Sequence, residues 1–223
     1  MDTPRTYGLS KTNIGGFVKK VFISGSNGNM GRRYASILKK LGIEYFGADK
    51  DVPVLDQASF CRKKDIDGII IATSTHTHLD LIALFGMIAK DIPILCEKPI
   101  LKQSFNKDEK LKLTMVNQYK YMIDESKVGK TDYNYFKSGS DGIVWDCINI
   151  IGLANGALSL KDSSPTWKCV INDQILNIKN MDKAYIEMVK DWSENPVSNW
   201  DYIVKAHKKC LEVLKSAKVK KSD

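Results

Sequence analysis

Short runs of β-branched and other apolar residues alternate with longer segments of helical period through the first half of the 223-residue chain. The strand-like runs show no polar alternation, which is typical of parallel strands that helices cover on both faces. We therefore expect a doubly wound α/β domain of the Rossmann type over residues 17–100. The expected strands are Lys19–Gly25, Ile43–Asp49, Asp67–Thr73 and Ile92–Pro99, and the expected helices are Gly28–Leu41, Leu55–Lys63 and His76–Ala89.

The second half of the chain follows a different pattern, with short strand-like runs first and helical segments last. Strands and helices without regular alternation predict a small α+β domain, which we place over residues 101–217. We interpret residues 1–16 as a flexible lead-in and residues 218–223 as a basic tail. The expected elements are a strand Lys112–Tyr119, a helix Val144–Asn155, a hairpin that turns at Asn172-Asp173, and two closing helices, Asp182–Ser193 and Trp200–Ala217.

The composition allows a substantial core, because 43% of the residues are apolar. The formal net charge of +8 comes from lysines spread along the chain, with a clear cluster only in the tail. A nucleic-acid interface would need basic and aromatic residues on one face, and the sequence shows no such stripe. We therefore expect a solvated basic surface that is compatible with anionic small molecules, and no nucleic-acid partner.

Five cysteines lie far apart, without a zinc-like spacing or a paired disulfide framework. We therefore expect no metal site and a reducing compartment, which favours the cytoplasm. Residues 1–16 lack the apolar core of a secretory signal, and no apolar run approaches the length of a membrane span. No membrane partner is expected.

Three glycines, at positions 25, 28 and 31, mark the turn between the first expected strand and the first expected helix. In a dinucleotide-binding turn, each glycine removes a side chain that would block the turn, the pyrophosphate or the helix-sheet contact, and the helix N-terminus favours the phosphate. The alternative is a glycine-rich turn without a ligand. The candidate cofactor-binding residues of this loop are Gly25, Ser26, Asn27, Gly28, Asn29, Met30 and Gly31.

An acidic residue ends the second expected strand, where the ribose hydroxyls of a dinucleotide bind. Asp49 lies 18 residues after Gly31 and favours NAD(H). Lys50, together with Arg32 and Arg33, could instead pair with the 2′-phosphate of NADP(H). The sequence leaves both cofactors open.

Two later stretches resemble signature segments of the glucose-fructose oxidoreductase and inositol dehydrogenase family, also called Gfo/Idh/MocA. They are IIIATSTHTHLDLIALF (Ile69–Phe85) and PILCEKPI (Pro93–Ile100). In that family a strand ends in Ala-Thr, a histidine follows, and the next strand ends in Glu-Lys-Pro. The matching residues here are Ala72, Thr73, His78, Glu97, Lys98 and Pro99.

The resemblance extends over most of the chain. The segment Met115–Tyr121 is similar to the strand after the Glu-Lys-Pro segment, and Ser140–Gly156 is similar to the substrate helix of the family. The resemblance also implies that the last helix packs back on the nucleotide domain. Because the family's second domain is usually much longer, the chain resembles a short form, which leaves the oligomeric state open with a dimer as one alternative.

The resemblance implies an NAD(P)-dependent oxidoreductase that transfers a hydride between nicotinamide and a carbohydrate-like hydroxyl or ketone, on a sugar or nucleotide sugar. Lys98 would contact cofactor and substrate, and Glu97 would orient either Lys98 or the nicotinamide amide. For His78 the alternative is an exposed residue at a helix start, and for Ser74 it is a helix cap. The cofactor-binding candidates after the glycine loop are Asp49, Lys50, Ala72, Thr73, Ser74, His78, Glu97 and Lys98.

One segment departs from the family pattern. The family's substrate helix usually carries Asp-x-x-x-His, and the aspartate matches Asp146, but the histidine position holds Ile150, or Asn149 if the helix is shifted by one. His207 lies on the last expected helix, where we expect it on the surface. The candidate catalytic residues are therefore Lys98, Asp146, Asn149 and Tyr119. One alternative is a catalytically weakened dinucleotide-binding sensor or scaffold, and for Asp146 alone another is a helix N-cap.

Overall fold

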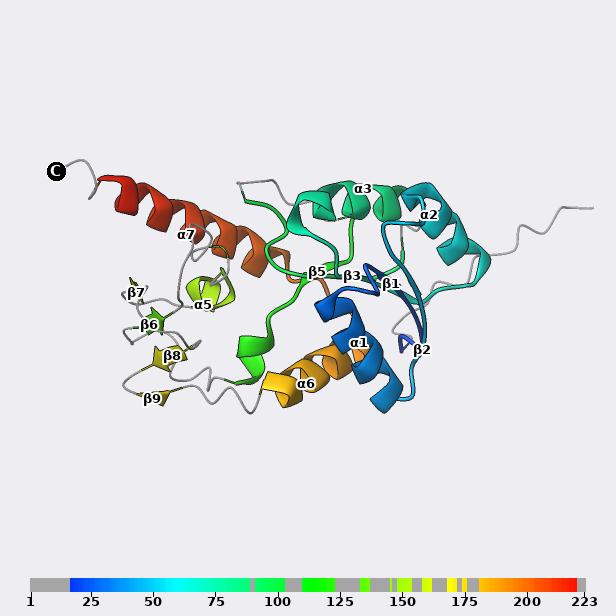
Figure 1. Cartoon of the computed structure of the whole chain (residues 1–223), viewed down its shortest axis with the longest axis horizontal. Coiled ribbons are helices and arrows are strands. Elements are labelled where there is room, and N and C mark those ends of the chain that lie inside the picture. Colours follow the sequence, from blue (N-terminus) through cyan, green and yellow to red (C-terminus); the bar gives the residue numbers. More distant parts are fainter. Residues whose placement is uncertain are drawn as a thin grey trace, which may run out of the picture.

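The computed structural model describes residues 17–88, 91–102, 110–122, 133–136, 145, 148–153, 158–161, 168–171, 174–175 and 181–219. The strands among these residues form two sheets (Figure 1). The expected lead-in and most of the expected basic tail lie outside the described ranges. No helix within these ranges combines the length and the apolar character that crossing a membrane requires.

The first sheet is parallel, with five strands in the order β2-β1-β3-β4-β5. The predicted doubly wound α/β architecture is confirmed. The sheet grows in opposite directions from β1, so the crevice between β1 and β3 is the switch point at which such sheets bind ligands. The strands are β1 (Lys20–Ser24), β2 (Glu44–Ala48), β3 (Gly68–Ile71), β4 (Ile94–Cys96) and β5 (Leu113–Met115).

The fifth strand lies beyond residue 100, where we predicted the first domain to end. We placed a strand Lys112–Tyr119 in the second unit, whereas β5 spans Leu113–Met115 and pairs with β4. Two of its three residues are buried, because this strand too is covered by other elements. The chain then turns into a short 3-10 helix, η2 (Gln118–Tyr121), which carries Tyr119 away from the strand. The domain boundaries themselves stay a prediction.

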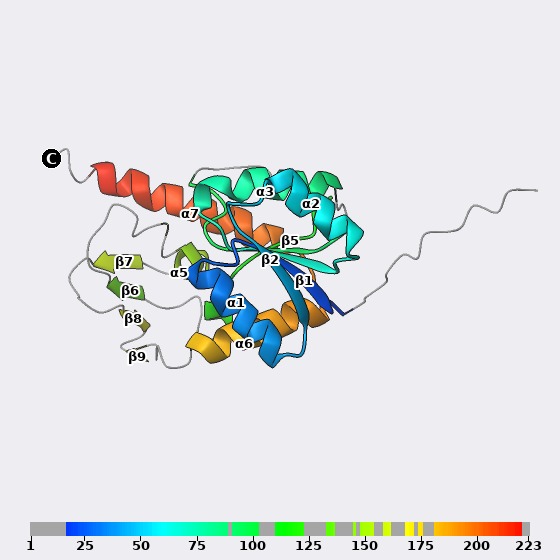
Figure 2. The same cartoon turned by 45° about the vertical axis from the view of Figure 1, so that its right-hand side comes forward.

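Helices cover both faces of the first sheet (Figures 1 and 2). Successive β1 residues point to opposite layers: Val21 and Ile23 pack with α1 and α6, while Phe22 packs with α2 and α3. Although we predicted its segment in the second unit, α6 thus covers the first sheet. The four helices are α1 (Asn29–Lys40), α2 (Val54–Lys63), α3 (His78–Ile88) and α6 (Met181–Glu194).

The second sheet has four strands in the order β7-β6-β8-β9. β6 and β7 are parallel, while β8 pairs antiparallel with both β6 and β9. The pairing of β8 with β9 confirms the predicted hairpin, whose turn residues Asn172 and Asp173 lie outside the described residues. The strands are β6 (Tyr133–Phe136), β7 (Leu158–Lys161), β8 (Lys168–Ile171) and β9 (Gln174–Ile175).

A long last helix, α7 (Trp200–Val219), begins near β5 of the first sheet, packs against α5 (Ile148–Leu153) and extends away from the first sheet toward the C-terminus (Figure 1). The side chain of Asn199, just before α7, binds the backbone of Met115 in β5. Its Oδ1 accepts a hydrogen bond from the Met115 N–H, and its Nδ2 donates to the Met115 carbonyl, both at 2.9 Å. These bonds take the place of a sixth strand at the β5 edge and fix the start of α7.

His207 lies in the core, so the prediction that it is a surface residue is wrong. Only 1% of its surface is exposed. Its Nδ1 lies 2.7 Å from the carbonyl oxygen of Ile203 on the same helix, and its ring lies 6.0 Å from the ring of Trp145. The sequence pattern of α7 did not show that α5 and its neighbours cover this side of the helix.

Candidate functional site

The glycine loop connects β1 to α1 through a tight turn. Gly25 has a φ of 87°, in the left-handed region that favours glycine. A Cβ at Gly31 would overlap the carbonyl oxygen of Gly25 and lie 2.7 Å from Ser26 Cα. The fold therefore requires glycine at both positions, because α1 packs directly on the turn.

Gly28 differs, because the fold does not require glycine there. Its φ is −69°, and a Cβ would find its nearest neighbour, the carbonyl oxygen of Gly25, 3.4 Å away. Gly28 is exposed, forms the N-cap of α1 and lines a large cavity. A side chain would therefore occupy space in front of a helix N-terminus, where amides and dipole favour a phosphate. The loop fits the pyrophosphate of a dinucleotide.

That cavity is a cleft of about 900 Å³ at the carboxyl ends of β1 and β3, the switch point of the sheet. Its volume is typical of cofactor sites. Ser26 and Gly31, two of the predicted loop residues, are not part of the wall. Ten predicted cofactor-binding residues form part of the wall: Gly25, Asn27, Gly28, Asn29, Met30, Asp49, Lys50, Ala72, Thr73 and Ser74.

Two backbone amides hold Asp49 at one end of the cleft. Its Oδ2 accepts a hydrogen bond from the Asn27 N–H at 3.0 Å, and its Oδ1 accepts one from the Lys50 N–H at 2.8 Å. The first bond ties the end of β2 to the glycine loop. The carboxylate is thus fixed where an acid meets the ribose hydroxyls of a dinucleotide, with Lys50 exposed at the same edge.

The two arginines of α1 serve opposite ends of the site. Arg32 donates to the carbonyl oxygen of Asn27 and, at 2.9 Å, to Oδ1 of Asn29, so it braces the glycine loop. Arg33 lines a second cavity instead. The structure therefore does not bring Arg33 to the position of a 2′-phosphate, because adjacent residues on a helix point about 100° apart.

His78 is buried, so the alternative of an exposed residue at a helix start is wrong. Only 1% of its surface is exposed, and its Nδ1 and Nε2 lie 2.9 Å and 3.0 Å from the carbonyl oxygens of Pro99 and Thr73. Burial lowers the pKa of His78, although the two carbonyl oxygens act in the opposite direction. His78 joins the loops after β3 and β4 and is not part of either cavity wall.

Ser74 lies at the entrance of the loop after β3. It precedes a short 3-10 helix, η1 (Thr75–Thr77), and makes no side-chain capping hydrogen bond. Its carbonyl oxygen accepts a hydrogen bond from the Thr77 hydroxyl at 2.9 Å. The side chain of Ser74 is thus available to a ligand in the cleft, whose wall it joins.

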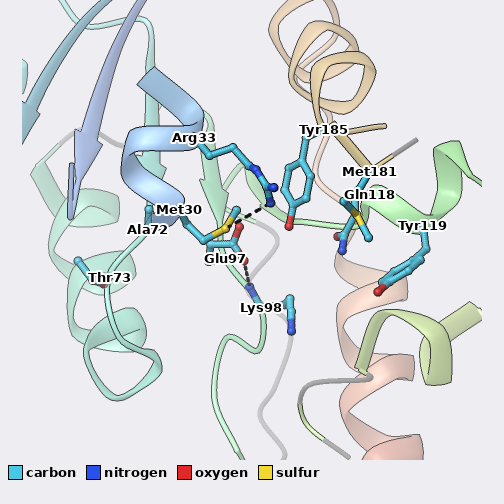
Figure 3. Close-up of a pocket in the computed structure, with 10 residues that line it drawn as sticks. All are labelled: Met30, Arg33, Ala72, Thr73, Glu97, Lys98, Gln118, Tyr119, Met181 and Tyr185. Carbon is cyan, nitrogen blue, oxygen red and sulfur yellow. Dashed lines mark hydrogen bonds between the residues drawn. The ribbon is translucent and has the colours of Figure 1, made fainter. Parts of the chain in front are cut away.

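A second cavity of about 460 Å³ meets the cleft at three shared residues, Met30, Ala72 and Thr73. In Figure 3, Glu97 and Lys98 lie on one side of this cavity, at the end of β4, and Tyr119 lies on the other. Two predicted catalytic residues, Lys98 and Tyr119, thus face one space. The complete wall consists of Met30, Arg33, Ala72, Thr73, Glu97, Lys98, Gln118, Tyr119, Met181 and Tyr185.

Two donors hold the buried carboxyl group of Glu97. The Tyr34 hydroxyl donates to Oε1 at 2.6 Å, and the Lys98 N–H donates to Oε2 at 3.2 Å. Burial raises the pKa of Glu97, and the hydrogen bond from Tyr34 counteracts this only in part. Burial and the nearby Glu97 together place the pKa of Tyr34 well above its ordinary value. Glu97 therefore fixes the backbone that carries Lys98.

Sequence reasoning missed the two tyrosines of this region. Tyr34 lies on the buried stripe of α1, and a buried tyrosine hydroxyl needs a partner, which is a signal that could have found it. Tyr185 comes from α6, its ring 6.1 Å from the ring of Tyr34 in an edge-to-face contact. Only the packing of α6 on α1 reveals its place at the cavity.

Asn149 lies behind the cavity wall. It has no exposed surface, its Nδ2 donates to Oε1 of Gln118 at 3.0 Å, and its Oδ1 accepts from the Tyr202 hydroxyl at 3.1 Å. Asn149 thus holds Gln118, which does line the cavity. Ile150 is equally buried, so the family's histidine position faces the core here. Asp146 lies outside the described residues.

The donor set of the site suits an organic cofactor. Among the described residues, no group of three or more His, Cys, Asp or Glu side chains could hold a metal ion. The cleft offers instead a helix N-terminus, backbone amides and a fixed carboxylate, which match phosphates and ribose hydroxyls.

No protein-family model and no curated protein matches the sequence, whereas solved structures do match the fold. A probable dehydrogenase from Thermotoga maritima has a TM-score of 0.67 at 14% identity, over 90% of this chain and 97% of that one. UDP-N-acetylglucosamine 3-dehydrogenase GnnA from Acidithiobacillus ferrooxidans has a TM-score of 0.60 at 12% identity, over 87% and 96%. An oxidoreductase from Sinorhizobium meliloti has a TM-score of 0.54 at 9% identity, over 87% and 95%.

These similarities extend over almost the whole length of each chain. Because the sequence identities are low, they show a common fold and nothing more. They agree with the two-sheet architecture and with the parallel first sheet. The fold implied by the resemblance to the Gfo/Idh/MocA family is confirmed, and this chain shares the architecture of Rossmann-type dehydrogenases and oxidoreductases.

Proposed function

We propose that the protein is an NAD(P)-dependent oxidoreductase of the Gfo/Idh/MocA type that acts on a hydroxyl or ketone of a sugar or nucleotide sugar. One observation carries the proposal: the cleft at the glycine loop and the cavity with Lys98 meet at Met30, Ala72 and Thr73. A dinucleotide whose pyrophosphate binds at Gly28 would therefore extend its far end toward Lys98.

The residues at the adenosine end favour NAD(H). The fixed carboxylate of Asp49 can accept hydrogen bonds from ribose hydroxyls and would repel a 2′-phosphate. Lys50 offers a counter-charge, but Arg32 braces the glycine loop and Arg33 lines the other cavity. The balance of charge at this edge therefore disfavours NADP(H).

A bound nicotinamide ring supplies or accepts the hydride. The chain's own task is to move a proton to or from the substrate oxygen, and Lys98 is our candidate because it lines the second cavity, half-buried at the end of β4. Tyr119 presents a phenol to the same cavity. General acid-base help of this kind contributes about a hundredfold to ten-thousandfold in rate. Asn149 acts through Gln118, which it holds.

The wall of the second cavity supports a carbohydrate-like substrate. It combines polar groups of Gln118, Tyr119 and Lys98 with the apolar side chains of Met30 and Met181, which suits the polar edges and apolar faces of a sugar. GnnA, one of the proteins of similar fold, is a UDP-N-acetylglucosamine 3-dehydrogenase.

The state of the cysteines supports a reducing compartment, such as the cytoplasm. Cys61, Cys96 and Cys210 are buried free thiols in the described part of the chain. Burial raises the pKa of Cys61 and of Cys210 to about 12, which keeps both thiols protonated and unreactive.

Titration with NADH and NADPH by isothermal calorimetry tests the cofactor step. We expect NADH to bind with a Kd of about 1 to 100 μM and more tightly than NADPH, and Asp49→Ser to remove the preference. In a screen of sugars and sugar ketones, Lys98→Met should lower kcat about a hundredfold or more, with a much smaller effect on the Kd of NADH. Lys112→Met, which removes an exposed lysine beside β5, is the matched control.

Failure of both nucleotides to bind would contradict the proposed function. Tight NADH binding without turnover of any sugar would instead favour the alternative of a dinucleotide-binding sensor or scaffold. Equal turnover by the Lys98→Met and Lys112→Met variants would remove Lys98 from the proton-transfer step.

A further inference from the structure

Arg33 projects from α1 into the second cavity (Figure 3). Its guanidinium carbon lies 4.9 Å from the centre of the Tyr185 ring, and its Nη2 lies 3.1 Å from Oδ1 of Asp182. Tyr185 is itself rigid, since only 4% of its surface is exposed and its ring packs edge-to-face against Tyr34. The cation is thus positioned on a buried aromatic platform, in the cavity that also contains Lys98.

The contacts of Arg33, which include a hydrogen bond to the side chain of Tyr185, leave part of its hydrogen-bonding capacity for a ligand. The side chains of Asp182 and Arg33 are 75% and 38% exposed, and an ion pair of this kind is weak and screened by salt. The contact between Nη1 and the sulfur of Met30 is 4.0 Å long, and sulfur is a weak acceptor. A guanidinium carries five N–H donors, so several can still reach a bound group.

The wall of the second cavity carries more positive than negative charge. Arg33 and Lys98 are cations, whereas Glu97 is the one carboxyl group among the described residues that line it. Burial raises the pKa of Glu97, although the hydrogen bond from Tyr34 and the charges of Lys98 and Arg33 act in the opposite direction. Gln118 contributes a neutral amide to the same wall. A cavity of this composition attracts an anion.

We propose, resting on the proposed function, that Arg33 binds an acidic group of the substrate, a carboxylate or a phosphate, while Lys98 faces the oxygen at the reacting carbon. The guanidinium fork can form two parallel hydrogen bonds to either group, and stacking on Tyr185 holds it ready to do so. The phosphates of the cofactor belong at Gly28, in the other cavity. The substrate class is therefore acidic sugars, in preference to neutral ones.

Calorimetric titration of the NADH-saturated protein with glucuronate, glucose 6-phosphate and glucose tests this assignment. Wild-type protein should bind at least one of the two acidic sugars about tenfold or more tightly than glucose. Arg33→Met should abolish that preference, and Arg33→Lys should retain part of it, because lysine keeps the charge but not the fork. Asp182→Asn should strengthen it, since it releases Nη2.

Lys183→Met is the matched control. It removes a cation next to Asp182 on α6 that is 75% exposed, pairs with Glu187 and is not part of the cavity wall. The preference for acidic sugars should survive this change. Thermal unfolding of each variant establishes that it is folded.

NADH titration of the same proteins separates the two proposals. Normal NADH binding without a preference for either acidic sugar would overturn the role of Arg33 alone, as would an unchanged preference in folded Arg33→Met. Weaker NADH binding by Arg33→Met, with the preference intact, would assign Arg33 to the cofactor and overturn its role. Failure of the wild type to bind NADH would overturn both proposals. The two acidic probes show whether the bound group is a carboxylate or a phosphate.

Discussion

Replacing Gly28 by serine should leave the fold intact and weaken NADH binding. The backbone at Gly28 is ordinary, and the nearest atom to an added Cβ is 3.4 Å away. Because serine is a preferred N-cap residue, we expect the free energy of unfolding to change by less than about 0.5 kcal/mol. The new hydroxymethyl group would stand in the pyrophosphate site, so the Kd of NADH should rise at least about tenfold, or 1.4 kcal/mol.

Gly31→Ala, three residues further along the chain, should in contrast reduce the stability of the fold. The added Cβ would overlap the carbonyl oxygen of Gly25 and lie 2.7 Å from Ser26 Cα, and backbone atoms cannot swing away. Alanine favours a helix interior by about 1 kcal/mol, whereas overpacking costs about 1–3 kcal/mol. Because the clash is with backbone atoms, we place its cost near the upper end of the overpacking range. The free energy of unfolding should therefore fall by about 1–2 kcal/mol, which lowers the Tm by about 2–8 °C.

Urea unfolding and NADH calorimetry on the same preparations check both variants. Wild-type NADH affinity in Gly28→Ser would show that no phosphate binds at this glycine. A loss of stability in Gly28→Ser as large as that in Gly31→Ala would show that the fold, and not a ligand, requires glycine at position 28. Either result would refute the reasoning from the turn geometry.

Two further variants test the support around the second cavity. Tyr34→Phe removes the hydroxyl that donates to Glu97 and favours its charged form. Because the pKa of Glu97 is raised in the folded protein, the contribution of Glu97 to stability is present at low pH and is lost as the pH rises through its folded-state pKa. The variant should therefore lose about 1–3 kcal/mol at weakly alkaline pH and less at acidic pH, and urea unfolding that shows an equal loss at both would contradict this. Asn149→Leu leaves Gln118 Oε1 without its donor, so it should destabilise the fold by about 1–3 kcal/mol. The Kd for NADH should not change. A weaker Kd in calorimetry, without a change in urea unfolding, would show that Asn149 acts on the ligand directly.

Local pattern was sufficient for the parallel sheet and for the glycine-loop end of the site. The apolar runs of β1, β3 and β4 contain no polar alternation, and a strand of that kind is stable only when both of its faces are covered. The glycine loop and Asp49 belong to one strand-turn-helix-strand unit, whose short connections bring them together. Ten of the positions that line the cleft could therefore be predicted before the fold was known, while others, such as Gln57 and Leu81, could not.

Tertiary packing decided the second cavity. Arg32 and Arg33 are chemically equal neighbours, and only the placement of α6, with Tyr185, shows that they serve different ends of the site. His207 was expected on the surface, and for His78 an exposed position at a helix start was the alternative to cofactor binding, but other elements cover both residues. The helix period tells which residues share a face, but the face that becomes buried depends on segments far away in the sequence. The sequence by itself thus determined the first sheet and the glycine turn, while the wall of the second cavity depended on how α6, η2 and α5 pack around the end of β4, because contacts between distant segments form only in the folded chain.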